Sequence, residues 1–562
     1  MRVGFSDLDS RTSTYESEFF PLDRSIIGRA PVGVSALTKN KVTPMDLPSG
    51  STVCFMIQRE AMFGDSVGGR NPSQPNAQAR SKTLFLSANT CQQPSPGVNN
   101  ASAPQLILVV SNSSELACHS PSKNSEAKTF TEGAVTLSLN MTGDLFVGVS
   151  APNVSTDFRG GYNFEIGASP DDFLHRYEGE DRSELLWMDS DSTSAILATR
   201  NLTEEESEIK RVMVEPLPYE LYVSNVEVPS SIGLRHSYCG LRNTAQIRAS
   251  QSSNNEANSP VKTAMTRRGP GGFPKQQFHF VSLNSSSKYT GILVKKARED
   301  GLNKRQDKAA DLGPGSVVFR ATDFETISGS SCKIVTDLEF CNEIQYAVPG
   351  NDRRFNNTGL GKAYDDYARK MYANFEKVMM QIPCDAPRTS LYSLARTCDD
   401  CKAAYKKWLC TVIMPRCEDF AASSNRFALA RNVGQAFPNG TKLAPDVRLN
   451  LEQKPASNSS RNKFIDQEVQ PGPYKEVLPC EDLCYEVVQS CPARIGFKCP
   501  RPEFPGFETS YGRRDQDAST VSCNFAGEAR TPINGGSVLL PRLRRAAGAA
   551  LFATAVVLGM WI

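Results

Sequence analysis

The placement of cysteine constrains this chain more than any other feature of its sequence. Sixteen cysteines occur in 562 residues, six of them between Cys54 and Cys341 and ten between Cys384 and Cys523. An even number of cysteines at high local density is typical of proteins that form disulfides in an oxidising compartment, and it is unusual in the reducing cytosol. We therefore expect a protein of the secretory route whose last third is cross-linked by disulfide bridges.

A zinc module and an enzyme are the alternatives that the same residues allow. Cys398 and Cys401 form one C-x-x-C pair, but no second pair follows at zinc-finger spacing. The strip from Asp189 to Ser194 begins like a calcium loop, yet it lacks the glycine and the glutamate that such a loop requires. Only four histidines occur, and each is isolated in sequence. We predict no enzymatic activity, no catalytic residue, no metal site and no cofactor.

Composition places the chain among multidomain globular proteins. Hydrophobic residues make up 39% of the sequence and charged residues 22%, and the formal net charge is +2. A length of 562 residues is typical of two to four domains. Because a surface of balanced charge gains little from the release of counterions, we do not expect a nucleic acid as partner.

Glycosylation signals agree with the compartment that the cysteines indicate. Nine Asn-x-Ser/Thr sequons without proline at the middle position are present. Their asparagines are Asn100, Asn112, Asn140, Asn153, Asn201, Asn284, Asn356, Asn439 and Asn458.

The C-terminal region, residues 526–562, is predicted to be a linker followed by a membrane-attachment signal. An apolar run of 17 residues from Ala546 to Ile562 follows three arginines. Small residues and a spacer precede this run, a pattern typical of a glycolipid-anchor signal, with Asn534 as the first candidate for attachment and Gly535 as the next. A transmembrane helix remains the alternative, although its arginines would be expected after the span; a tail anchor would leave the cysteines in the cytosol.

The N-terminus does not match a secreted protein. Residues 1–29 contain no apolar core of a secretory signal. We expect residues 1–46 to be an N-terminal extension that lacks its leader.

The first two thirds of the chain are predicted to be rich in β-sandwiches. Short alternating apolar segments between polar turns indicate a first sandwich-like domain at 47–180 and a second β-rich domain at 181–358. The polar stretches 249–275 and 295–315 are interpreted as surface loops. The expected strands are 52–57, 83–87, 105–110, 134–139, 144–149, 161–166, 194–199, 219–228, 276–283, 289–295, 316–321 and 343–348.

The pattern changes to helical spacing at Gly359. Apolar residues between Tyr364 and Met379 recur at three- and four-residue steps, and further helices are expected at 402–414 and 481–489. On the last helix Cys480, Cys484 and Cys491 share one stripe and are expected to tie it to neighbouring segments. The fold class is therefore multidomain, with an α-helical, disulfide-rich domain at 359–525 that contains an exposed excursion at 421–474.

The sequence of this cysteine-rich domain resembles a known family. The stretches CDDCKAAYKKWLCTVIMPRC at 398–417 and PCEDLCYEVVQSCPARIGFKCP at 479–500, with Tyr511-Gly512 and Cys523-Asn524, are similar to the fungal stretch-activated calcium channel family, also called calcium-influx-promoting proteins. DRSIIGRAP at 23–31 and the β-rich region after it resemble the luminal part of the same family. The resemblance covers nearly the whole chain.

The resemblance implies an extracellular glycoprotein that regulates a plasma-membrane calcium channel. The expected partner is a large pore-forming, four-repeat, voltage-gated-type calcium channel subunit, and the expected role is to promote stretch- or stress-linked calcium influx. The implied location is the extracellular face of the plasma membrane, after passage through the endoplasmic reticulum. The cysteine-rich domain is similar to the auxiliary subunit of the animal sodium-leak channel and, more distantly, to Frizzled domains.

Other functions are compatible with parts of the sequence. Members of the family have been described as stretch-activated calcium-permeable cation channels in their own right, but no uninterrupted apolar helix of about 20 residues precedes Ala546, which favours a subunit. A surface-anchored adhesin or receptor would share the sandwiches, sequons and anchor without needing this cysteine arrangement. A Frizzled-like receptor for a secreted ligand and a lumenal enzyme are the remaining alternatives.

The residues that the resemblance points to are structural. It implies that the ten clustered cysteines build a disulfide-locked platform that docks on the outer loops of the pore subunit. Tyr405 and Trp408 are candidate core or contact aromatics, and packing is the favoured role of Trp408. Disulfide connectivity cannot be deduced from the sequence. The ten cysteines are Cys384, Cys398, Cys401, Cys410, Cys417, Cys480, Cys484, Cys491, Cys499 and Cys523.

Overall fold

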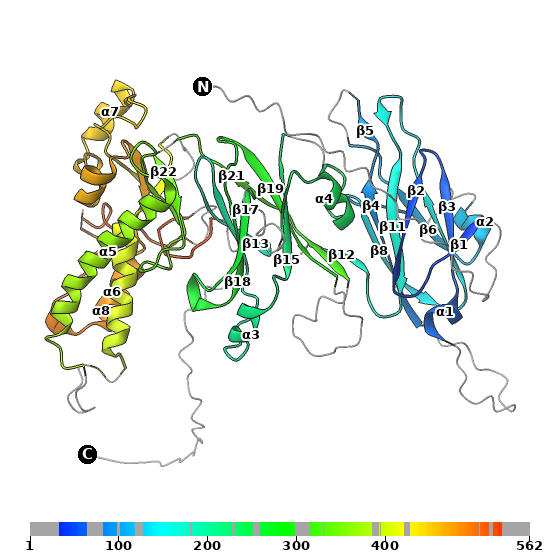
Figure 1. The fold of residues 1–562 in the computed structure, drawn as a ribbon, viewed down its shortest axis with the longest axis horizontal. Coiled ribbons are helices and arrows are strands. Elements are labelled where there is room, and N and C mark those ends of the chain that lie inside the picture. The colour runs from blue at the N-terminus through cyan, green and yellow to red at the C-terminus, as the bar shows by residue number, and fades with distance from the viewer. Residues whose placement is uncertain are drawn as a thin grey trace, which may run out of the picture. The chain divides into compact units, whose positions relative to one another are not determined.

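The first apolar core forms between two β-sheets, in a computed structural model of the chain (Figure 1). One sheet has the strand order β1 (Val34–Ala36), β3 (Thr52–Ile57), β9 (Leu145–Ser150), β6 (Ile107–Ser111) and β7 (Lys128–Thr129). The other has the order β2 (Lys41–Leu47), β11 (Tyr162–Ser169), β4 (Lys82–Gln92) and β8 (Ala134–Met141). The structure describes the following residues, which we call the described residues: 33–64, 82–97, 102–118, 127–179, 183–227, 231–250, 259–297, 315–329, 331–384, 393, 395–420, 427–504, 506–515 and 521–530.

Alternating apolar side chains join these two sheets. The rings of Phe55 on β3 and Phe164 on β11 are both fully buried and meet edge to face, with centroids 6.2 Å apart. Such pairs of inward-facing aromatics stabilise packed sheets beyond the area that they bury. Short elements complete this region: α1 (Arg59–Phe63), α2 (Ser114–Cys118), and the pair β5 (Ser95–Pro96) and β10 (Phe158–Arg159).

A second pair of sheets follows in the chain. Its larger sheet has the order β12 (His175–Glu178), β20 (Ser316–Phe319), β19 (Lys288–Lys295), β15 (Tyr219–Asn225) and β16 (Ile247–Ala249), with β21 (Thr322–Glu325) also paired to β19. The smaller sheet has the order β13 (Leu185–Ser190), β14 (Ala195–Thr199), β18 (Lys275–Phe280) and β17 (Val261–Thr266). Inward-facing residues of both sheets share one core, and the helices here are α3 (Ile209–Val214), α4 (Tyr238–Thr244) and the 3-10 turn η4 (Pro270–Gly272).

The outer face of the smaller sheet is apolar as well. Leu186, Met188 and Ile196 belong to a core that continues into β22 (Cys332–Val335) and β23 (Tyr346–Pro349). The same core includes Leu360 and Tyr364 of helix α5 (Asn357–Met379). The apolar packing therefore runs without a break from the second pair of sheets into the helical region.

The helical region consists mainly of α5, α6 (Cys398–Ile413) and α8 (Glu481–Ser490), which lie side by side in Figure 1. Helix α5 begins where the Asn356 side chain accepts a hydrogen bond from the Gly359 amide at 2.7 Å. Helix α6 begins with a capping box, because the Thr397 hydroxyl accepts from the Asp400 amide and the Asp400 carboxylate accepts from the Thr397 amide.

The predicted elements overlap observed ones. Every segment expected to be a strand overlaps a strand, and each expected helix overlaps α5, α6 or α8. The stretch 249–275 differs from the interpretation as a surface loop, because it contains strand β17. Exposed Lys262 and Ala264 alternate there with buried Val261 and Thr263, so the apolar signal of this edge strand is weak.

The excursion predicted at 421–474 is also different in the structure. Apart from residues 421–426, which lie outside the described residues, it contains β25 (Ala428–Arg431), α7 (Pro445–Glu452) and the short helices η7 (Pro455–Ser457) and η8 (Ile465–Val469). Strand β25 joins a three-stranded sheet with β26 (Tyr474–Val477) and β24 (Arg416–Glu418). The buried Glu476 accepts from Arg431 and Arg461, each at 2.6 Å. Because their charges are paired with Glu476, Arg431 is buried and Arg461 is half-buried although the stretch is polar.

Candidate functional site

The helical region is cross-linked at several points. Cys401 on α6 is bonded to Cys491 directly after α8, with the two Cα atoms 4.6 Å apart. Cys384, which follows α5, is bonded to Cys398 at the start of α6. Aromatic rings fill the space beside these bridges, and Phe375 stacks on Tyr405 with centroids 3.8 Å apart. Helices α5, α6 and α8 are therefore joined by both disulfides and aromatic packing.

The three cysteines of the α8 stripe lead to three different segments. Cys480 is bonded to Cys523, Cys484 to Cys499, and Cys491 to Cys401. This arrangement attaches one helix of ten residues to its surroundings at both ends and in the middle. A helix so short is marginal on its own in water, so its stability comes from these attachments and from packing.

Two of the ten clustered cysteines form bridges that the sequence did not indicate. Cys410 is bonded to Cys341 and Cys417 to Cys332, so the ten do not pair only among themselves. Cys332 and Cys341 precede residue 359, the predicted start of the cysteine-rich domain. The two bridges close separations of 69 and 85 residues and connect α6 and β24 to the β22–β23 region. Together with η9 (Ala493–Ile495), these elements form what we call the cysteine module, residues 331–384 and 395–530.

A groove of about 360 Å³ lies over the Cys341–Cys410 bridge. Lys407 of α6 lies on one side, with its ammonium 3.4 Å from the Glu486 carboxylate of α8 and 4.0 Å from the centre of the Phe525 ring. The Gly269–Gly271 loop of the second pair of sheets also lines the groove. The groove thus combines cationic, acidic and aromatic groups from segments far apart in sequence.

Trp408 and Tyr405, the two aromatics selected from the sequence, are half-buried and pack inside the module. The Trp408 indole N–H donates to the Tyr511 hydroxyl at 2.8 Å. Burial raises the pKa of Tyr511, so its hydroxyl stays protonated and accepts this bond at neutral pH. Both aromatics therefore serve packing and orientation inside the module.

A buried charge cluster connects the cysteine module to β13. Asp189 is fully buried, and its carboxylate accepts from Arg416 at 2.9 Å and from Arg530 at 2.6 Å. Arg530 also bonds Glu418 at 3.0 Å. Burial by itself raises the pKa of Asp189, but the charges of Arg416 and Arg530 outweigh burial and lower that pKa below its usual value. Sequence reasoning missed this cluster, because its members are as much as 341 residues apart.

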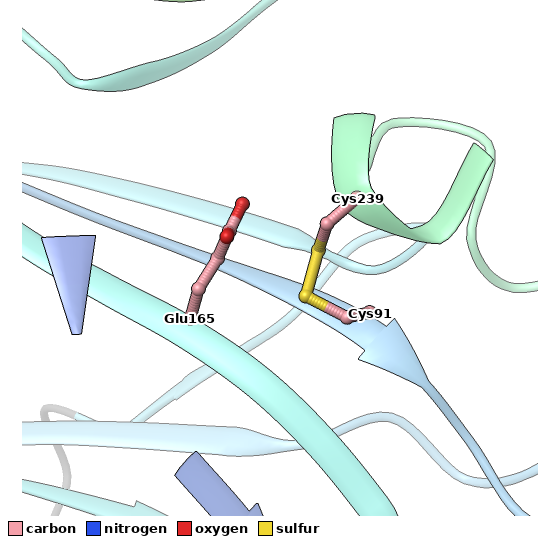
Figure 2. A group of neighbouring side chains, drawn as sticks. All are labelled: Cys91, Glu165 and Cys239. Atoms are coloured by element: carbon pink, nitrogen blue, oxygen red, sulfur yellow. A yellow bond between two sulfur atoms is a disulfide. The ribbon is translucent and has the colours of Figure 1, made fainter. Parts of the chain in front are cut away.

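The first two β regions are linked by the Cys91–Cys239 disulfide between β4 and α4 (Figure 2). Cys91, Cys239 and Glu165 form the one group among the described residues that brings three potential metal ligands within reach of one another. Figure 2 shows that the two sulfurs are bonded to each other. Thiolates are the form that coordinates a metal, and a disulfide offers none. This cluster is therefore a cross-link beside a carboxylate that pairs with His175 at 3.1 Å.

The predicted glycosylation asparagines are mostly on the surface. Asn201 is half-buried, and Asn100 lies outside the described residues. Asn356 is the N-cap of α5, and Asn439 accepts from the Thr441 hydroxyl of its own sequon. The exposed sequon asparagines are Asn112, Asn140, Asn153, Asn284, Asn356, Asn439 and Asn458.

The predicted terminal features lie outside the described residues. Asn534, Gly535 and the apolar run at 546–562 fall there, as does the stretch at 1–32. Within the part of the chain that the structure describes, every helix is too short or too polar to cross a membrane.

Together, these features define a strand-rich protein with a disulfide-rich, helical C-terminal region. The family model described as "Stretch-activated Ca2+-permeable channel component" matches residues 83–529 of this sequence. The chain therefore belongs to this family, in agreement with the resemblance seen in the cysteine motifs.

Curated relatives from fungi carry related names. The stretch-activated cation channel yam8 of Schizosaccharomyces pombe is 33% identical over 369 residues, which are 65% of this chain and 64% of that protein. The stretch-activated cation channel MID1 of Saccharomyces cerevisiae is 28% identical over 399 residues, 67% of this chain and 65% of that protein. MID1 of Cryptococcus neoformans is 24% identical over 204 residues, 33% of this chain and 32% of that protein. The match thus spans less than two thirds of the length of each of these relatives.

Proposed function

We propose that this protein is an extracellular component of a fungal calcium channel complex at the plasma membrane, and that it promotes stretch- or stress-linked calcium influx. The observation that carries the proposal is the family match over residues 83–529, which includes fifteen of the sixteen cysteines. The sequons and the eight disulfides support passage through the endoplasmic reticulum, where both modifications are made.

The proposed partner is a pore-forming, four-repeat, voltage-gated-type calcium channel subunit. The proposed contact surface is the cysteine module, a Frizzled-like helical platform whose α6 and α8 are joined by Cys401–Cys491. A rigid platform loses little conformational entropy when it docks, so its binding energy is available to favour one state of the pore. Such a module changes gating only by the difference between its affinities for the open and the closed pore.

Calcium uptake in a strain that lacks the gene tests this function. Expression of the wild-type chain is expected to restore uptake, and the double variant Cys401→Ser/Cys491→Ser is expected to lose both uptake and co-purification with the pore subunit. The double variant Cys54→Ser/Cys118→Ser is the matched control, because it removes a bridge in the first β region, between β3 and α2. Equal rescue by both variants, at equal amounts on the cell surface, would contradict the role of the module.

The printed names of the relatives favour a second candidate, a stretch-activated cation channel formed by this chain alone. The two functions are separated by reconstitution of the purified protein into liposomes without any other polypeptide. A calcium-permeable current that responds to membrane tension in those liposomes would favour the second candidate over the first.

A further inference from the structure

Residues 524–530, the last seven described residues, contact both the rest of the cysteine module and the second pair of sheets; we call them the strap. At its start, Asn524 donates its backbone N–H to the Leu478 carbonyl at 2.7 Å, and its carbonyl accepts from the Cys480 amide at 3.0 Å. Phe525 follows, and the centre of its ring lies 4.0 Å from the Lys407 Nζ atom and 4.7 Å from the Arg514 Cζ atom. These contacts attach the first half of the strap to the module without covalent bonds.

The second half of the strap contacts the second pair of sheets. The backbone at Gly527 approaches Gly269 so closely that a Cβ atom added at Gly527 would lie 2.1 Å from the Gly269 Cα. Gly527 has φ of 80°, which also favours glycine at this position. Arg530 then donates its backbone N–H to the Trp187 carbonyl at 2.7 Å and its side chain to Asp189. The strap therefore connects the rest of the cysteine module to the second pair of sheets. These two regions also share an apolar core, so they would stay in contact if the strap were removed.

The strap also forms part of the groove and the core. Phe525 and Ala526 line the groove over the Cys341–Cys410 bridge, and Ala526 and Ala529 are buried in the core shared with Leu186. Displacing the strap would remove one wall of the groove and uncover part of this core. It would also leave Asp189 with Arg416 as its remaining arginine partner in the cluster.

A disulfide bond lies directly before the strap and would stop its displacement; we call it the covalent stop. Cys523 is bonded to Cys480, the residue that caps the start of α8. Among the described residues, tension that enters from the C-terminal side would meet Arg530 first, and would reach a covalent bond at Cys523. The noncovalent part of this load path is seven residues long, from 524 to 530.

We propose that the strap is a tension-sensitive latch: load on the C-terminal side peels residues 530 to 524 away in that order, stops at the Cys480–Cys523 bridge, and opens the groove over Cys341–Cys410. The peeling follows from the contacts above. Its use as the stretch-sensing step rests on the proposed function. The rest of the module stays folded while the latch opens, because the Cys401–Cys491 bridge that joins α6 and α8 lies behind the Cys480–Cys523 bridge on this path.

Single-molecule pulling of the oxidised full chain tests the latch. One handle is attached at position 214, where Val214 on α3 is 84% exposed, and the other at the C-terminus. The expected first event from the folded chain is a reversible step that lengthens it by no more than about 25 Å, the extended length of seven residues. A first step well beyond that length with disulfides intact overturns the proposal.

Two variants identify the contacts and the stop. Arg530→Gln is expected to raise the opening rate extrapolated to zero force by about 10- to 100-fold at an unchanged step length, because it removes charged hydrogen bonds. The double variant Cys480→Ser/Cys523→Ser is expected to lengthen the first step to about 110 Å, because the next covalent stop on this path is Cys499. Arg211→Gln on α3 is the control, since its pairs with Glu208 and Glu215 lie in an exposed helix.

The length of the first step of the wild-type chain tests the latch even where a variant fails to fold. An Arg530→Gln chain that is folded and opens at the wild-type rate overturns the role assigned to the charge cluster. Calcium uptake by the deletion strain is measured separately. Because pulling needs neither a cell nor a pore subunit, an absent peeling step overturns the latch alone, whereas absent rescue by the wild-type chain overturns the proposed function alone.

Discussion

Arg416 and Asp189 form an ion pair across 227 residues of sequence, with the Arg416 Nε atom 2.9 Å from the Asp189 Oδ2 atom. Their side chains are 1% and 0% exposed. The Arg416 guanidinium also donates to the carbonyls of Met188 and Glu528. Arg416 of strand β24 therefore contacts both β13 and the strap. The charge cluster thus lies where the cysteine module meets the second pair of sheets, which we call the junction.

Removing Arg416 is expected to destabilise the protein strongly. Arg416→Met leaves the Asp189 carboxylate buried beside fewer cations, which typically lowers the free energy of unfolding by about 3–5 kcal/mol. Guanidinium denaturation followed by tryptophan fluorescence measures the change. Arg211→Met, in an exposed pair, is the control and is expected to leave the midpoint unchanged. Equal midpoints for the two variants would show that the buried pair does not stabilise the junction.

The lowered pKa of Asp189 predicts a loss of stability in acid. Since the unfolded chain binds a proton at this carboxyl near its ordinary pKa of 3.8 and the folded chain does so only at lower pH, the stabilisation is fully present above 3.8. It is lost as the pH falls below 3.8 toward the folded-state pKa. Unfolding free energies measured across this interval are expected to fall more steeply for wild type than for Asp189→Asn. Asp399→Asn, at a side chain 93% exposed, is the matched surface control for this comparison.

Two of the bridges of α6 are predicted to differ in their contribution to stability. Cys401–Cys491 closes a separation of 90 residues and Cys384–Cys398 one of 14. Because a longer loop loses more entropy in the unfolded chain when it is closed, replacing the first pair by serines should cost about 1.7 kcal/mol more than replacing the second. Denaturant titration of the two double variants compares them directly. The reverse order would mean that native-state contacts, rather than loop entropy, dominate the difference.

The hydrogen bond between Trp408 and Tyr511 is open to a double-mutant cycle. Trp408→Phe and Tyr511→Phe each remove one partner of a half-buried bond and are expected to lower the free energy of unfolding by about 1 kcal/mol beyond any packing loss. The coupling energy from the two single variants and the double variant is expected to be about 0.5–1.5 kcal/mol. Strictly additive effects would indicate that the two residues stabilise the module independently.

Local patterns predicted many of the strands and the three main helices and, in part, how one helix is attached to its neighbours. Alternation indicated β3 at Thr52–Ile57, and spacing at three and four residues indicated α5. The stripe of cysteines on α8 predicted a helix tied to its neighbours, and each of the three has a different partner segment. Periodicity is a property of neighbouring residues, so the sequence displays it directly.

Partners distant in the chain were not predictable in the same way. Nothing near Cys410 or Cys417 indicates that they bond to Cys341 and Cys332. The polar stretch that contains Arg431 was interpreted as exposed, although its guanidinium is buried against Glu476. Polarity predicts exposure only while no opposite charge is close enough to offset the loss of hydration.

The order of residues alone indicated most of the predicted helices and strands, showed that cysteines concentrate at 384–523, and showed to which family the motifs are similar. The tertiary structure decided which sulfurs pair, where the groove opens, and that Arg530 reaches Asp189 beneath Trp187. The physical reason is that a disulfide or a buried ion pair forms between groups that are a few ångströms apart in space. Sequence separation carries no information about that distance once the chain has folded back on itself.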